Sequence, residues 1–69
     1  MSGDALVLEE IIKLTEDAEE RLHTAIRRLG SVSSAQIEIE QLQHALLHIE
    51  RAKRLVLSRT VNQVRRVAP

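Results

Sequence analysis

Residues 29–37 read LGSVSSAQI, and this stretch decides the fold because it ends one amphipathic helix and begins another. Gly30 directly follows the last apolar residue of a periodic run, where a helix end favours a residue that tolerates a left-handed backbone. Ser33 has Gln36 three places further on, which is the spacing of a capping box. The turn occupies only about five residues, a length typical of antiparallel helix pairs. We therefore predict an all-α antiparallel two-helix hairpin that turns at residues 30–33.

The segments on both sides of the turn carry apolar residues at helical spacing. Val32 and Ile37 bracket the expected start of the second helix at the spacing of a hydrophobic staple. Asp4 is the expected N-cap of the first helix. The predicted boundaries are a disordered lead-in at 1–3, a helix at 4–29, the turn at 30–33, a helix at 34–66 and a tail at 67–69.

An apolar seam with alternating steps of three and four residues runs along each predicted helix, as in a coiled coil. The middle of the first seam is small, at Thr15 and Ala18, so a facing helix can approach closely there. The residues expected to form the hairpin core are Leu8, Ile11, Ala18, Leu22, Leu29, Leu42 and Leu46.

A hairpin buries one side of each helix, and this sequence has apolar residues outside both seams, such as Ile37 and Leu47. A chain of 69 residues is also smaller than the size at which a single core is comfortably stable. We therefore expect the hairpin to pair into a helical bundle, either with a second copy as a homodimer or with a partner. The residues assigned to partner binding are Ile49, Ala52, Leu55 and Val56.

The formal net charge is zero, but the two halves of the chain differ in sign. Residues 1–29 hold seven acidic and four basic side chains, and residues 30–69 hold three acidic and six basic ones. An antiparallel turn brings opposite charges together, which supports this orientation of the helices. The side chains expected to face one another are the acidic Asp4, Glu9 and Glu10 and the basic Lys53, Arg54 and Arg59.

The composition argues against catalysis and against a cofactor. There is no cysteine, no aromatic residue and no Gly-rich phosphate loop, and the serines cluster in the turn, where capping explains them. Glu40, His44 and His48 follow one another at i, i+4 and i+8, a spacing that puts possible zinc ligands along one helix face, to which His23 could add. Solvated histidines explain this pattern better, so we predict no metal site and no enzyme activity.

The sequence has no apolar run of the roughly 18 residues that a membrane span requires, and its start lacks the basic residues of a secretory signal. The expected location is the cytoplasm.

The chain resembles the small co-chaperones of the type III secretion needle subunit, the YscE, PscE and SsaE type. The resemblance covers nearly the whole chain, with LEE at 8–10 opening the first helix and IExA at 49–52 followed by LV at 55–56 in the second. It implies a cytoplasmic bacterial protein that pairs with a tetratricopeptide-repeat chaperone. The resulting heterodimer keeps the needle subunit monomeric before export.

Two other functions stay open from the sequence. The chain is alternatively a homodimeric scaffold in which two hairpins form a four-helix bundle. A less favoured alternative is binding of nucleic acid or a membrane surface through the basic side chains of residues 51–66.

Overall fold

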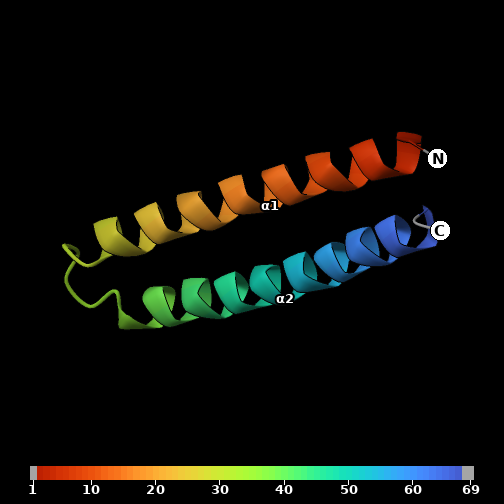
Figure 1. Cartoon of the computed structure of the whole chain (residues 1–69). Helices are drawn as coiled ribbons and strands as arrows, with labels where there is room; N and C mark the ends of the chain where they lie inside the picture. Colours follow the sequence, from red (N-terminus) through yellow and green to blue (C-terminus); the bar gives the residue numbers. More distant parts are fainter. Residues whose placement is uncertain (1, 68–69) are drawn as a thin grey trace.

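The chain is a hairpin of two long helices that run antiparallel (Figure 1). The computed structural model describes residues 2–67 and the side chains of residues 3–62. Helix α1 spans Ser2–Leu29 and helix α2 spans Gln36–Val67. The predicted all-α hairpin is therefore confirmed, and the described residues include no strand. The molecule is slender, with principal extents of 57 × 15 × 12 Å.

Helix α1 begins earlier than predicted. Ser2 and Gly3 already belong to the helix, so they are not a disordered lead-in, while Met1 lies outside the described residues. Asp4 lies in the first turn and Arg27 and Arg28 in the last, where their charges complement the helix dipole. Helix α2 ends one residue beyond the predicted boundary, and residues 68–69 of the predicted tail lie outside the described part of the chain.

Helix α1 ends without the left-handed glycine that the sequence suggested. The Gly30 amide donates to the carbonyls of Ile26 and Arg27, both at 3.2 Å. The Ser31 amide donates to Arg28 at 3.2 Å, and the Val32 amide donates to the Leu29 carbonyl at 2.9 Å. These i→i+3 bonds tighten the last turn and satisfy the terminal carbonyls. Helix α1 does end directly before Gly30, as predicted, but neither glycine of the chain has a positive φ, so the expected left-handed backbone at Gly30 is absent.

The left-handed residue of the turn is Ser34, with a φ of 61°. Helix α2 then begins at Gln36, two residues later than predicted, and the Ala35 carbonyl accepts its first bond, from the Ile39 amide at 2.9 Å. Ala35 therefore occupies the N-cap position. No hydrogen bond joins Ser33 to Gln36 within the described turn, so the expected capping box does not form.

The hydrophobic staple is not formed either. Val32 is 56% exposed and Ile37 is 71% exposed, so neither side chain covers the other effectively. Ala35, which is only 6% exposed, is instead the apolar residue that is buried at the turn end of the hairpin.

The two helices meet along seams with strict alternating steps of three and four residues. The α1 seam consists of the half-buried residues Ala5, Leu8, Ile12, Thr15, Glu19, Leu22, Ile26 and Leu29. The α2 seam consists of Ala35, Ile39, Leu42, Leu46, Ile49, Lys53, Val56 and Thr60, all buried or half-buried. This spacing is the coiled-coil pattern predicted from the sequence.

Most of the predicted core residues lie at this interface. Leu46 is buried, and Leu8, Leu22, Leu29 and Leu42 are half-buried. Ile11 and Ala18 are the exceptions. Ile11 is 36% exposed and its neighbour Ile12 takes its place in the seam, and the half-buried Ala18 lies beside the seam, where Glu19 takes its place. The hydroxyls of two seam threonines form hydrogen bonds within their own helices. Thr15 donates to the Ile12 carbonyl at 2.7 Å, and Thr60 donates to the Val56 carbonyl at 3.0 Å.

The core of a single hairpin is thin. Among the described side chains only Ala35 and Leu46 are buried, and none of the large apolar side chains is fully enclosed. The chain exposes 5733 Å², whereas a compact folded monomer of 7.8 kDa exposes about 4,400 Å². The hairpin therefore leaves about 1,400 Å² more surface in contact with solvent than a compact monomer of its mass does.

Candidate interaction surface

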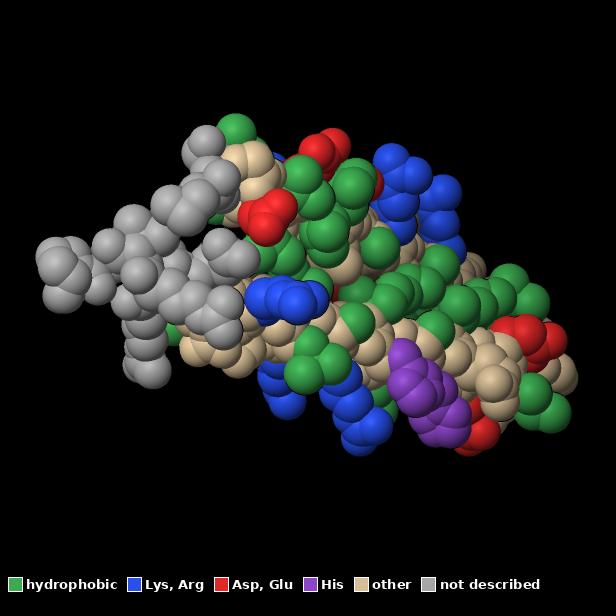
Figure 2. All heavy atoms as spheres, turned by 90° about the vertical axis from the view of Figure 1, so that its right-hand side faces the viewer, with side chains coloured by type: hydrophobic (Ala, Val, Ile, Leu, Met, Phe, Trp, Pro, Cys, Tyr) green, Lys and Arg blue, Asp and Glu red, His purple; other side chains and the backbone are tan. Residues whose placement is uncertain are grey.

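Large apolar side chains are exposed on both helices. Figure 2 shows hydrophobic side chains that form a broad band across one face of the molecule, with basic, acidic and histidine side chains around it. The most exposed are Leu55 at 74%, Ile37 at 71%, Leu6 at 65% and Leu14 at 62%. The others are Val7, Ile11, Val32, Leu47, Leu57 and Val61. Because so many apolar side chains remain outside the seam, the surface is suited to binding another helix or protein.

Part of this apolar surface is a stripe on α1 that one charged residue interrupts. Val7, Ile11 and Leu14 each lie one residue before a seam residue, and Ala18 and Ala25 continue the same four-three spacing towards the turn, with the exposed Arg21 at the position between them. One residue corresponds to a rotation of about 100° around a helix. The five apolar residues, which we call the second stripe, therefore run parallel to the seam along an adjacent side of α1.

The four residues predicted to bind a partner do not lie on one free face. Leu55 is 74% exposed and Ala52 is also exposed, so both are available to a partner. Ile49 and Val56 are half-buried in the α2 seam, where they pack towards α1. Their assignment to a partner stays a prediction, and the seam between them passes through Lys53 rather than through Ala52.

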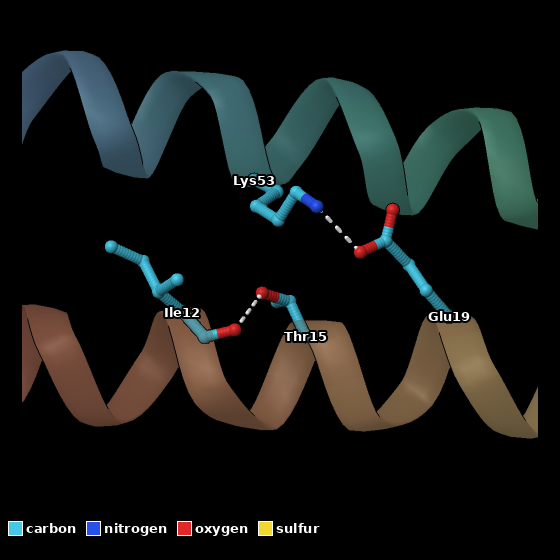
Figure 3. Close-up of polar contacts among 4 residues, drawn as sticks. All are labelled: Ile12, Thr15, Glu19 and Lys53. Carbon is cyan, nitrogen blue, oxygen red and sulfur yellow. Dashed lines mark hydrogen bonds and ion pairs between the residues drawn. The ribbon is translucent and has the colours of Figure 1, made fainter.

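The sequence reasoning missed the charged pair at the centre of the seam. The Lys53 ammonium donates to the Glu19 carboxylate, with 2.7 Å between Nζ and Oε1, and the two side chains reach across from opposite helices (Figure 3). Their side chains are only 23% and 15% exposed. Two signals pointed to this pair: both residues continue the seam spacing, and their charges are opposite.

The surroundings of Lys53 favour its charged form. The hydrogen bond to Glu19 raises the pKa of Lys53 above its ordinary value of 10.5, although partial burial acts in the opposite direction. The charges of Glu19, Glu16 and Glu50 raise this pKa further. Lys53 is therefore a cation at neutral pH, and the contact is an ion pair.

The predicted charge matching between the helices is only partly present. Lys53 pairs with Glu19 in the middle of α1, not with the acidic residues near its start. Asp4 and Arg59 line the same open depression at the ends of the helices, together with Val7 and Leu8. The described residues contain one further ion pair, between Arg21 and Asp17 on the same helix at 3.2 Å, and its side chains are 81% and 55% exposed.

The histidine pattern of α2 lies on the surface. Glu40, His44 and His48 are all exposed, as is His23 on α1. Within the described residues, no three histidine or acidic side chains gather closely enough to hold a metal ion. The depression lined by Asp4 and Arg59 is open and shallow, and it brings no nucleophile together with a base.

Over their described lengths, neither α1 nor α2 has the long uncharged apolar stretch that crossing a bilayer requires. Compared with protein-family models, curated proteins and solved structures, the chain matches none of them.

Proposed function

We propose that the chain is a bacterial co-chaperone of type III secretion, which binds a tetratricopeptide-repeat chaperone and helps to keep the needle subunit monomeric before export. The observation that carries the proposal is the excess of exposed apolar surface on a hairpin in which only two described side chains are buried. Such a chain gains stability when a partner covers that surface. The resemblance of LEE at 8–10, IExA at 49–52 and LV at 55–56 to needle co-chaperones supplies the identity of the partner.

A repeat chaperone is a suitable partner because its stacked helices form a long concave surface. The hairpin is a rod 57 Å long and 12–15 Å across, a shape that can lie along such a surface. On α2, the exposed Leu55 lies on the side away from the seam and the exposed Ala52 lies beside the seam, and these two are the contacts we assign to the partner.

The proposal is tested by co-purification of a tetratricopeptide-repeat chaperone and needle subunit with variants of the hairpin. Leu55→Asp and Ala52→Glu each place an unpaired charge in the interface, so we expect at least about 100-fold weaker binding. Gln43→Glu is the matched control, because it adds the same charge at an exposed polar position on another side of α2. We expect it to bind normally.

Measuring binding at low and at high salt distinguishes the co-chaperone function from binding through the basic side chains of α2. Contacts to phosphate weaken steeply as salt rises, whereas apolar burial does not. If Leu55→Asp and Ala52→Glu still bind while added salt releases the partner, the co-chaperone proposal is wrong and the basic side chains of α2 are the binding surface.

A further inference from the structure

The second stripe of α1 has large residues at one end and small residues at the other. Val7, Ile11 and Leu14 occupy its N-terminal half, and Ala18 and Ala25 occupy the half nearest the turn. Small residues allow two helix backbones to approach closely, and large side chains from a neighbour can fill the space above them. A neighbour that fits this stripe must therefore present small residues opposite the large ones and large residues opposite the small ones.

An antiparallel copy of the same stripe has this arrangement. We propose that the second stripe binds the second stripe of another copy of the chain, with a two-fold axis near the level of residue 16. Leu14 of each copy then packs on Ala18 of the other, and Val7 packs on Ala25. Ile11 lies level with the partner's Arg21, whose aliphatic stem can cover it while the guanidinium stays in solvent. A closed two-fold dimer results, since each copy contributes the same surface.

The charges beside the stripe favour the same orientation. Asp4 and Glu10 are exposed at the acidic end of α1, and Arg21 and Arg28 are exposed towards its other end. In the antiparallel pair, Asp4 lies level with the partner's Arg28 and Glu10 lies close to the level of the partner's Arg21. A parallel pair would instead place like charges side by side, which is unfavourable. Arg21 is free to turn towards the partner, because its bond to Asp17 is largely exposed.

The whole hairpin has more exposed surface than a dimer of ordinary size covers. A standard interface buries about 800 Å² on each partner, and the hairpin as a whole, of which the second stripe is one part, exposes about 1,400 Å² more than a compact chain of its mass. A second copy fits the stripe, because α1 itself carries both the large and the small residues, and both the acidic and the basic side chains, that the pairing requires. The inference does not depend on the proposed function, whose assigned contacts are Ala52 and Leu55 on α2.

The first experiment measures mass by sedimentation equilibrium at several concentrations. We expect the native chain to be a dimer at tens of micromolar and Leu14→Asp to be a monomer at the same concentration. Leu55→Asp is the matched control, with a similarly exposed leucine on the other helix, and it should remain a dimer. Circular dichroism should show that both variants stay helical, because both positions are exposed. A monomeric native chain, or a dimer lost in Leu55→Asp but kept in Leu14→Asp, would overturn the inference.

The second experiment determines the orientation with disulfides, which the cysteine-free sequence makes straightforward. A Leu14→Cys chain mixed with an Ala18→Cys chain should cross-link between chains under mild oxidation. Val7→Cys alone should not cross-link, because the antiparallel pair places the two copies of this residue about 27 Å apart along the helix axis. Efficient Val7→Cys dimers without the Leu14–Ala18 cross-link would show a parallel pair and refute the antiparallel one.

Discussion

Ser34 holds a φ of 61° two residues before α2 begins. A left-handed backbone costs a residue with a Cβ about 1 kcal/mol or more, and glycine is nearly free of that penalty. The turn therefore contains strain at a serine, while its glycine adopts an ordinary backbone. Gly30 lies four residues earlier, and a Cβ built on it would meet the Arg27 carbonyl oxygen at 3.2 Å, a tight contact without left-handed strain.

The first prediction concerns these two residues. We expect Ser34→Gly to raise the free energy of unfolding by up to about 1 kcal/mol, because it relieves the left-handed strain. Ser34→Val should lower it, since a β-branched side chain tolerates this backbone poorly. Gly30→Ala is the comparison: it adds the tight contact with the Arg27 carbonyl oxygen but no left-handed strain, so it should cost less stability than Ser34→Val. Urea titration measures all three variants, and a large loss in Gly30→Ala without a gain in Ser34→Gly would place the left-handed residue at position 30.

At the scale of elements, the hairpin follows from the sequence but the rotation of each helix about its own axis does not. On α1, the apolar pattern favours a seam through Ile11 and Ala18, whereas the structure uses Ile12 and Glu19. Ile11 and Ile12 are adjacent in the sequence, as are Ala18 and Glu19. Hydrophobic periodicity therefore distinguishes only weakly between the two possible seams. The ion pair between Glu19 and Lys53 favours the observed rotation, and it becomes visible only when both helices are considered together.

The rotation of α2 also decides which of the residues predicted to bind a partner are exposed. The seam passes through Ile49, Lys53 and Val56, and this leaves Ala52 exposed beside it. The predicted capping box in the turn was wrong for a related reason. Ser33 and Gln36 have the spacing of a capping box, but α2 starts too late for Ser33 to cap it.

The second prediction concerns the Glu19–Lys53 pair. We expect Lys53→Met to lower the melting temperature by a few degrees at neutral pH, because it leaves the Glu19 carboxylate half-enclosed without a partner. The pKa of Lys53 is raised in the folded state, so its contribution is fully present below the ordinary value of 10.5 and is lost as pH rises through the raised value.

Thermal unfolding of both proteins between pH 7 and pH 12 measures this dependence. The difference between native protein and Lys53→Met should stay constant up to about pH 10 and shrink above it. Lys13→Met removes an exposed lysine and serves as the control, with little effect at any pH in this range. A difference that persists unchanged at pH 12 would mean that the lysine contributes through its aliphatic stem and not through its charge.

At the scale of the whole molecule, the hairpin is long for its mass. Its radius of gyration is 16.1 Å, whereas a compact chain of this length has a value of about 11 Å. A rod has a high ratio of surface to interior, so the stability of the fold depends on a second molecule that covers its exposed apolar surface. The shape is the reason for proposing both a partner surface on α2 and a dimer interface at the second stripe of α1. Stability should therefore rise with protein concentration or with the concentration of a partner.

The position of the turn also determines the order in which the molecule folds. The start of α1 and the end of α2 lie together, far from the turn (Figure 1). Bringing Leu29 to Leu42 closes a loop of about a dozen residues, whereas bringing Ile12 to Thr60 closes one nearly four times longer, at an entropic cost about 1 kcal/mol higher. The seam should therefore form first beside the turn and then extend outwards.

In kinetic terms, Leu42→Ala should mainly slow folding and Ile12→Ala should mainly accelerate unfolding, as stopped-flow measurements on the monomeric Leu14→Asp background would show. The open end of the hairpin is then the last part to form and the first to separate, so native opening begins at the acidic start of α1, where the second stripe also begins.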